Sequence, residues 1–292
     1  MIVRITGGIG NQMFQYALKM QFDRTLKSSN EIDTHFYQQK NIHNGYELNK
    51  VFGIDAIHYG GKKRALSDKF PLLYKICFKL GIRSLKTKNT LTEIRTCFLP
   101  EVFDYTKANA YIDGYWQSEE YFLDVKEDVR ATFQFPAFDE EENCRLEQMI
   151  INTQSVSIHV RRGDYVGASR FLSLGQTDYY QSAIEYIKKK VNSPLFIILS
   201  DDIKWCKKNL DLPQNSIFVT WNDRAKSYRD MQIMSICKHN IIANSSFSWW
   251  GAWLNNNPEK IVVAPSRFFN GSKEDDSHII PLNWVKINIG ET

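Results

Sequence analysis

The stretch SVSIHVRRGDYV, residues 155–166, brings a histidine, two arginines and an aspartate to the end of an apolar run. Apolar side chains at every second position are the two-residue period of a β-strand, which puts His159 and Arg161 on one face. One arginine–aspartate pair can simply hold a turn together. Two adjacent arginines with Asp164 as their neighbouring acid are better explained as a receptor for an anion.

A second polar cluster, ANSSFSWW at residues 243–250, also follows an apolar run. Hydroxyls and backbone amides at the start of a helix form a phosphate site. Ser245 or Ser246 can equally cap the helix, a role that needs no ligand. Because the arginine strand belongs to the same predicted sheet, we favour the phosphate site.

Near its beginning the chain has an apolar strand at 2–6, the loop GGIGNQ, and apolar residues at helical spacing from 14 to 22. This order predicts a strand, a glycine loop and a helix. Gly8 and Gly10 permit a tight backbone path, and Asn11 lies where a helix N-cap would be.

After residue 152 strands alternate with helices, a pattern that predicts a parallel sheet in a Rossmann-like domain. The expected strands are 156–161, 195–199, 217–220, 240–243 and 261–264, and the expected helices are 178–190, 204–209, 226–238 and one from 247. In such sheets ligands bind beyond the carboxyl ends of the strands. This rule selects Arg161, Arg162 and Asp164; Ser200, Asp201 and Asp202; Trp221 and Asn222; and Asn244, Ser245 and Ser246.

The bulk composition fits an ordinary globular protein. The 292 residues are 43% hydrophobic and 24% charged, enough for two domains of about 150 residues each. We place the boundary after an acidic segment, giving an N-terminal domain at 1–152 and a C-terminal domain at 153–292. The net charge of +4 is mild, and no nucleic-acid-binding signature occurs, so nucleic acid is not expected as a partner.

The cysteines and the apolar runs bear on localisation. The five cysteines are scattered without a C-x-x-C pair, which indicates neither a disulfide framework nor a zinc site and fits a reducing compartment. There is no leader pattern and no run of about 18 apolar residues. We therefore expect a cytoplasmic protein without a membrane span.

The segment 62–88 is strongly basic, with nine Lys or Arg against the single acid Asp68. An amphipathic basic helix here can lie on an anionic membrane surface. The alternative, favoured by base rate, is a charged solvated face over an ordinary core stripe. That stripe would consist of Leu72, Leu73, Ile76, Cys77 and Leu80, with Lys75 and Lys79 turned away from it.

Three stretches in order, GGIGNQMFQYA at 7–17, HVRRGDY at 159–165 and ANSSFSWWGAWL at 243–254, resemble glycosyltransferase family 11. These are inverting α-1,2-fucosyltransferases that use GDP-fucose; the protein O-fucosyltransferases and α-1,6-fucosyltransferases are similar more distantly. The resemblance implies an α/β, GT-B-like fold with two facing Rossmann-like domains. The C-terminal domain would bind GDP-fucose, and the N-terminal one would help with the acceptor.

The resemblance also implies a bacterial enzyme of surface polysaccharide synthesis, such as O-antigen synthesis, that acts on a glycan ending in galactose. A lipid-linked acceptor would allow peripheral contact of 62–88 with the inner membrane. Tyr115 and Trp116 can stack on a sugar, but aromatic residues in a domain of this size are more often core.

The implied roles follow from the chemistry of the leaving group. Breaking the fucose C1–O bond leaves GDP with growing negative charge, which a guanidinium on the β-phosphate stabilises. Arg161 is our first choice, with Arg162 as support or as partner of Asp164. Asp201 or Asp202 would accept hydrogen bonds from guanine or ribose. The residues expected to bind the donor are Gly8, Gly10, Asn11, His159, Arg161, Arg162, Asp201, Asp202, Asn244, Ser245, Ser246 and Phe247.

The general base is not fixed by these residues. Asp164 lies near the arginines, but pairing with an arginine lowers the pKa of a carboxylate and makes it a weaker base. Asn11 can orient the acceptor hydroxyl, as a matching Asn does in the similar O-fucosyltransferases, and His159 is better explained as a structural or donor contact. The catalytic set is thus Arg161, Asp164 and Asn11.

Other interpretations remain. The SDD at 200–202 resembles a metal-binding carboxylate pair, but the arginines already supply positive charge and the family works without a divalent ion, so we expect neither metal nor cofactor. A different fucosyl linkage and a non-catalytic GDP-sugar or glycan-binding module are the alternatives. A nicotinamide-dependent oxidoreductase is disfavoured, because the loop lacks the third spaced glycine and Asp33 is the only near ribose partner.

Overall fold

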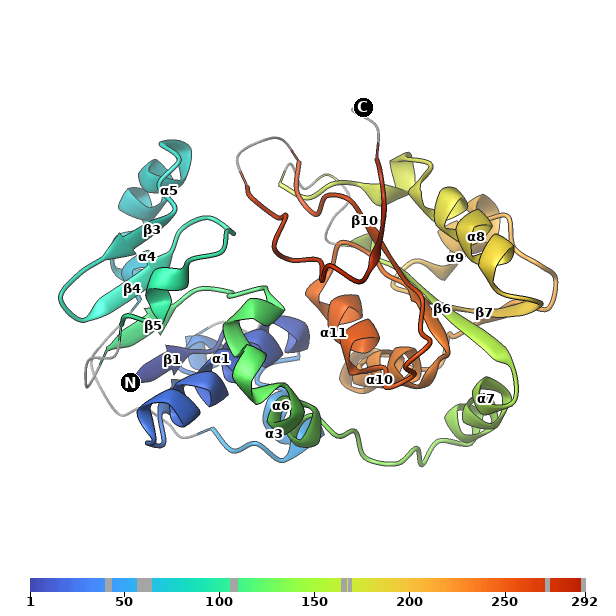
Figure 1. The fold of residues 1–292 in the computed structure, drawn as a ribbon, viewed down its shortest axis with the longest axis horizontal. Helices are drawn as coiled ribbons and strands as arrows, with labels where there is room; N and C mark the ends of the chain where they lie inside the picture. The colour runs from blue at the N-terminus through green and yellow to red at the C-terminus, as the bar shows by residue number, and fades with distance from the viewer. Residues whose placement is uncertain are drawn as a thin grey trace. The chain divides into compact units, whose positions relative to one another are not determined.

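The computed structural model describes residues 1–39, 44–56, 65–105, 110–163, 167, 170–270 and 274–289. The chain forms two compact units (Figure 1). Unit 1 is Met1–Phe135 with Gly271–Pro281, and unit 2 is Pro136–Asn270 with Leu282–Thr292. Each unit has its own largely parallel sheet and helices, which confirms the predicted α/β class with two sheets.

Unit 1 has a five-stranded sheet in the order β2-β1-β5-β4-β3, in which only the β3–β4 pair is antiparallel. Its strands are β1 (Ile2–Arg4), β2 (Glu31–Asp33), β3 (Ser84–Lys86), β4 (Thr90–Glu93) and β5 (Tyr111–Asp113). Its helices are α1 (Ile9–Leu26), α2 (Phe36–Gln39), α3 (Leu48–Phe52), α4 (Leu66–Lys69), α5 (Pro71–Lys79) and α6 (Lys126–Thr132), with 3-10 turns η1 (Pro100–Val102) and η2 (Glu119–Val125). The predicted strand, loop and helix at the beginning of the chain are confirmed as β1 and α1.

Unit 2 has a six-stranded, wholly parallel sheet in the order β11-β10-β9-β6-β7-β8. Its strands are β6 (Gln154–Val160), β7 (Pro194–Ser200), β8 (Ile217–Phe218), β9 (His239–Ile241), β10 (Val262–Pro265) and β11 (Val285–Ile287). Its helices are α7 (Glu141–Ile151), α8 (Tyr179–Lys190), α9 (Ile203–Asn209), α10 (Tyr228–Ile236) and α11 (Ser246–Leu254), with 3-10 turns η4 (Leu174–Gln176) and η5 (Arg224–Lys226). The predicted alternation after residue 152 is confirmed.

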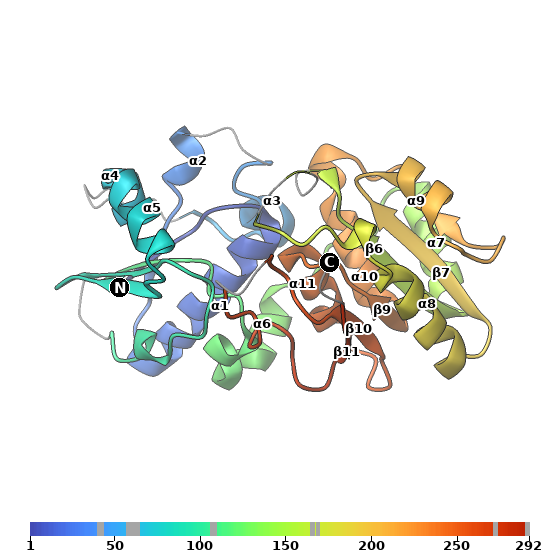
Figure 2. The same ribbon diagram turned by 90° about the horizontal axis from the view of Figure 1, so that it is seen from above.

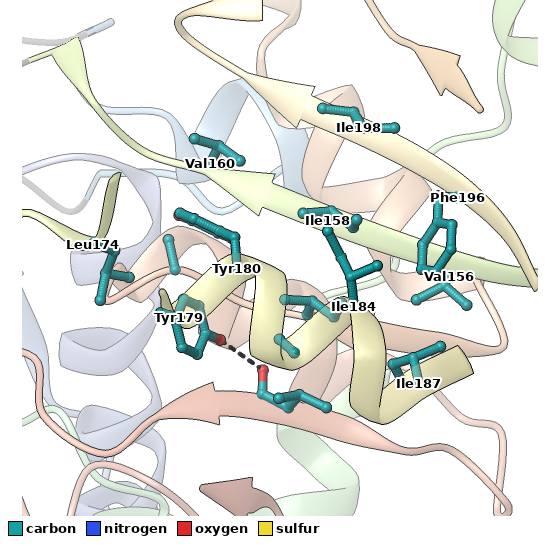
Figure 3. Packing of buried hydrophobic residues seen from close by; sticks show 14 of the residues in the cluster. Val156, Ile158, Val160, Leu174, Tyr179, Tyr180, Ile184, Ile187, Phe196 and Ile198 are labelled. Atoms are coloured by element: carbon teal, nitrogen blue, oxygen red, sulfur yellow. Dashed lines mark hydrogen bonds between the residues drawn. The ribbon is translucent and has the colours of Figure 1, made fainter. Parts of the chain in front are cut away.

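The core of unit 2 lies on both faces of the central strands. On one face the apolar side chains of β6 pack against α8, as Figure 3 shows for Val156, Ile158 and Ile184. On the other face, Ile197 and Leu199 of β7 pack with α7 and α10. A parallel strand covered by helices on both sides is buried throughout, which is why β6 is buried along almost its whole length.

The division of the chain differs from the predicted boundary at 152. Leu146 and Ile150 of α7 are buried against the unit 2 sheet, so this helix belongs to unit 2, which begins at Pro136. The chain also returns to unit 1 near its end, where the Ser118 hydroxyl donates to the carbonyl of His278 at 2.9 Å. The acidic segment is therefore the first helix of the second unit.

The basic segment 62–88 does not form the expected core stripe. Residues 62–64 lie outside the described part of the chain. In α5, which lies beside α4 (Figure 2), Cys77 is buried, but Leu72 and Leu80 are 71% and 72% exposed. The expectation was wrong because only one side of this short helix packs on unit 1. Among the described helices, none combines the length and the apolar character needed to cross a bilayer.

Candidate active site

The strand order of unit 2 selects one place for a ligand. The chain runs outward from β6 through β7 to β8, then returns to the other side of β6 as β9, β10 and β11. This is the doubly wound order, whose topological switch point lies between β6 and β9. Ligands of such sheets bind at the carboxyl ends of the two strands that flank the switch point. Those ends carry Arg161 and Asn244, the two clusters that the sequence singled out.

Arg161 directly follows β6 and is held by Asp201 at the end of the neighbouring strand. Its Nη1 lies 3.1 Å from Asp201 Oδ2. The other contacts of Asp201 are backbone: its carboxylate accepts from the amides of Arg162, at 2.9 Å, and Gly163, at 3.1 Å. A side chain at position 163 would meet Asp201, since a Cβ there would lie 2.9 Å from Oδ2. The Arg161 side chain stays 31% exposed, so a ligand can reach it.

The Arg162 side chain is less exposed than that of Arg161, 19% against 31%. Its Nε pairs with Asp202 Oδ2 at 3.2 Å, and its guanidinium lies 4.5 Å from the centre of the Trp205 ring. Asp202 also caps α9 by accepting from the Trp205 amide at 3.0 Å, and these two contacts lower the pKa of its carboxyl. Gly175 leaves room for this stack, because a Cβ there would lie 2.7 Å from Arg162 Nη1. Arg162 therefore supports the turn that carries Arg161, and its expected contact with the donor or with Asp164 stays a prediction.

Asp201 and Asp202, expected at guanine or ribose, both contact this arginine turn. Their carboxylates fix the two arginines and three backbone amides. The supporting role was not foreseen, although the strand-end rule had placed both pairs at the same edge. Binding of a nucleotide by either carboxylate stays a prediction.

His159 is buried behind the arginines. Its ring lies 5.5 Å from that of Phe247 at the start of α11, and its Nδ1 has no hydrogen-bond partner among the described residues. Burial, together with the nearby Arg161 charge, lowers the pKa of His159 to about 3. The imidazole is therefore neutral at physiological pH. This contact joins β6 to the α11 start and confirms that the two clusters lie together.

The start of α11, which Phe247 joins to His159 of β6, provides hydrogen-bond donors. Ser245 is the N-cap, and its side chain accepts from the Phe247 amide at 3.3 Å. Asn244 is turned inward, donating to the carbonyls of Leu172 and Phe268 at 2.9 and 2.8 Å. Ser246 is partly exposed at the first turn of the helix. The capping alternative thus holds for Ser245. Ser246 lies in the first turn, where a side chain can donate a hydrogen bond to a bound anion.

Two amide side chains to which no sequence motif pointed hold the glycine loop of unit 1. The N-cap of α1 is Gly8, so the expectation that Asn11 caps the helix was wrong. Gln12 is fully buried and donates to the carbonyls of Gly7 and Gly45 at 3.0 and 2.9 Å. Gln15 is also fully buried and donates to the Gly114 carbonyl at 2.9 Å. Two glutamines among the apolar residues of a helix were the available signal.

Asn11 lies in the first turn of α1, with Gly10 buried beside it. Its Oδ1 accepts from Gln117 Nε2 at 2.7 Å. Its Nδ2 lies against Gly7, where an added Cβ would be only 2.7 Å away. Gly7 has φ +80°, so both its conformation and its surroundings call for glycine. The loop thus presents a fixed Asn11 amide, which fits the predicted task of orienting a hydroxyl.

Three remaining predictions have different outcomes. Asp164, the candidate base, lies outside the described residues. Trp116 is fully buried, with its ring 5.5 Å from that of Tyr121, so the core interpretation holds for it. Among the described residues no group of three or more His, Cys, Asp or Glu is placed to hold a metal ion. The need for a metal stays untested.

The chain is similar to proteins that are named as glycosyltransferases. The model of glycosyl transferase family 11 matches residues 90–288. An alpha-1,2-colitosyltransferase of Escherichia coli is 36% identical over 98% of both chains. The O-antigen biosynthesis glycosyltransferase WbnK of Escherichia coli is 31% identical over 97% of this chain and 99% of the relative. Human galactoside alpha-(1,2)-fucosyltransferase 1 is 27% identical over 61% of this chain and 52% of its own length.

Proposed function

The chain belongs to glycosyl transferase family 11 and is a glycosyltransferase, and on this premise we propose that it transfers L-fucose from GDP-β-L-fucose to the 2-hydroxyl of a terminal galactose. The reaction would invert the configuration at C1. The observation that carries this proposal is Arg161, held by Asp201 at the switch point of unit 2 and still open to a ligand.

Arg161 would act on the leaving group. As the C1–O bond breaks, the electron pair stays on the β-phosphate oxygen, and the negative charge there increases. A guanidinium fixed before the reaction starts stabilises this charge without reorganising, and such a donor contributes about 3 kcal/mol to the transition state. The α11 start, with the Ser246 hydroxyl, would hold the rest of the diphosphate.

We assign the contact with the acceptor hydroxyl to Asn11 of unit 1. Asn11, whose Oδ1 is engaged by Gln117, would offer its Nδ2 to the acceptor hydroxyl and orient an oxygen lone pair toward C1. Asp164 stays the candidate for the proton. The neutral His159 has the wrong pKa for a general base near pH 7, because its pKa is about 3.

The linkage and the biological role are supported by the names of relatives. Both the Escherichia coli colitosyltransferase and the human fucosyltransferase form 1,2 linkages according to their names, and WbnK is named for O-antigen biosynthesis. We infer the same linkage for this chain, and a role in bacterial surface polysaccharide synthesis. A non-catalytic module and a nicotinamide enzyme are set aside because the chain belongs to a transferase family.

Colitosyl transfer is the second candidate, because a relative at 36% identity is named for it. Colitose is fucose without the 3-hydroxyl, so both donors present the same diphosphate to Arg161. Competition between GDP-fucose and GDP-colitose at equal concentration decides between the two. A ratio of kcat/KM above about 10 for one donor corresponds to about 1.4 kcal/mol of discrimination.

The decisive experiment measures GDP release from GDP-fucose and lactose in the presence of EDTA. We expect turnover that survives EDTA, and a fall in kcat of about 10² to 10³-fold for Arg161→Ala. Arg145→Ala removes an equivalent guanidinium from the exposed surface of α7 and serves as the matched control. Turnover that EDTA abolishes, or equal losses in both variants, would contradict the proposal.

A further inference from the structure

Helix α5 presents an apolar face to solvent. Leu72, Ile76 and Leu80 follow one another at intervals of four residues, so they lie in one row on the helix surface. Ile76 is 45% exposed, and its two neighbours in the row are exposed further. Leu73 and Phe70, 45% and 54% exposed, extend this group, which we call the α5 face. Single exposed apolar residues are normal, but a contiguous group marks a contact surface.

The opposite side of α5 fastens the helix to unit 1. Cys77 is buried, and the Tyr74 hydroxyl donates to the carbonyl of Ile94 at 3.3 Å. The Arg95 guanidinium lies 5.2 Å from the centre of the Phe78 ring, and its Nε donates to the Phe78 carbonyl at 3.0 Å. One side of α5 is thus fixed to unit 1. These contacts orient the helix so that the α5 face points to solvent.

Lysines flank the apolar row of the α5 face. Lys75 and Lys79 lie three residues after Leu72 and Ile76, so they flank this exposed row instead of being turned away from it as expected. Within 65–88 the cations are Lys69, Lys75, Lys79, Arg83, Lys86 and Lys88. The one acid of this range, Asp68, is paired with Arg4 at 2.6 Å. Arg83 and Lys86 have acidic partners on other elements of unit 1, Asp275 at 3.6 Å and Glu101 at 3.5 Å. The positive charge beside the apolar row therefore comes from Lys75 and Lys79.

The apolar row and its flanking lysines together indicate which partner covers the α5 face. A two-fold contact with a second copy would place the same patch against itself and bring its cations together. A bilayer span is excluded by size, because the nine residues of α5 reach about 14 Å, half of the hydrocarbon thickness. Apolar side chains flanked by lysines on one helix are the composition of segments that lie in a lipid interface.

We propose that α5 docks unit 1 on a membrane surface that carries anionic phospholipids. The apolar row enters the boundary between headgroups and acyl chains, and the lysines contact lipid phosphates. This inference depends on neither the sugar donor nor the acceptor. It can therefore fail while the proposed function stands, or stand while the proposed function fails.

The test measures flotation of the purified protein with two kinds of vesicle. We expect binding to vesicles of phosphatidylethanolamine and phosphatidylglycerol, weakened by salt, and much weaker binding to pure phosphatidylcholine. Leu72→Ser/Ile76→Ser/Leu80→Ser should abolish flotation. Lys75→Gln/Lys79→Gln should weaken it about 30-fold, since each lysine contributes about fivefold. GDP release with a soluble acceptor should stay unchanged in both variants.

Matched controls carry the same chemical changes elsewhere. Leu282→Ser alters a leucine that is 98% exposed, and Lys188→Gln/Lys189→Gln alters two exposed lysines of α8. Both should float like the wild type, and all variants should keep their circular dichroism and melting temperature. Equal binding of the wild type to phosphatidylcholine, or equal losses in controls and α5 variants, overturns the proposal. So does a serine variant that only turns a dimer into a monomer.

Discussion

Among single residues, His159 has a structural role in the site. Its ring contacts Phe247 and so joins β6 to the start of α11. Because the side chain is buried, the folded state favours the neutral form of the imidazole. The charge of Arg161 acts in the same direction, since protonation would place two cations at one strand end. His159 therefore links the fold of unit 2 to pH.

We expect the His159→Phe variant to lose part of the acid sensitivity of the protein. The folded-state pKa, about 3, is below the unfolded value near 6.5, so the unfolded chain binds the extra proton between these values. The contribution of the neutral His159 to the free energy of unfolding is therefore fully present above pH 6.5. It falls with decreasing pH, by up to about 1.4 kcal/mol per pH unit. Urea unfolding at a series of pH values from 4.5 to 8 measures this slope as roughly one proton. Parallel curves for wild type and variant would contradict it.

Asn11 and Gln117 form the residue pair that we assign to the acceptor. Gln117→Ala frees the Asn11 amide to rotate, so kcat should fall by about tenfold while the affinity for GDP stays the same. In a double-mutant cycle, Asn11→Ala/Gln117→Ala should be no worse than Asn11→Ala alone, because the pair acts as one unit. Isothermal titration with GDP and initial rates measure the two effects. Additive losses would show that Gln117 does not act through Asn11.

At the scale of elements, the start of α11 separates two serines that the sequence treated alike. Ser245→Ala removes the cap on the Phe247 amide and should lower the free energy of unfolding by about 1 kcal/mol. Ser246→Ala should leave the melting temperature unchanged and weaken GDP binding by about tenfold or more, the loss of one hydrogen bond to a charged group. Differential scanning fluorimetry and GDP titration distinguish them. The assignment fails if Ser246→Ala binds GDP like the wild type.

The same scale explains what the sequence could predict. Strands β6, β7 and β9 are buried on both faces and separated by amphipathic helices. In the sequence they are short apolar runs between segments of helical periodicity, so they can be recognised directly. The end of β6 pairs with the end of β7, Val160 with Ser200, so the strand-end rule was enough to bring Arg161 and Asp201 together. In unit 1 most strands have only three residues, too few for a period to be recognised.

Other features depended on packing that no local pattern contains. α7 looks like a linker helix until Leu146 and Ile150 meet the unit 2 sheet. The α5 stripe has the spacing of a core helix, but its row at Leu72 and Leu80 meets solvent. Spacing tells which residues share a face, whereas burial depends on whether another element covers that face.

On the scale of the whole molecule, the division into two units makes a prediction about where GDP acts. The chain passes between the units at Phe135, Asn270 and Pro281, so each unit is built from separate segments that a ligand can stabilise as one body. If GDP binds unit 2 alone, it stabilises that unit by about 2.7 kcal/mol at a concentration of 100 times Kd.

Hydrogen exchange with and without GDP tests this. We expect the slowest amides of the unit 2 sheet to exchange up to about 100-fold more slowly with GDP, and peptides covering 161–163, 200–205 and 244–248 to gain local protection. Amide exchange in the unit 1 sheet should slow less, because GDP alone does not occupy the acceptor site that we assign to unit 1. GMP, which lacks the β-phosphate that Arg161 is proposed to contact, should protect these peptides less than GDP. Protection centred on the glycine loop at 7–12 would move the donor site to unit 1, and the role of Arg161 would have to be given up with it.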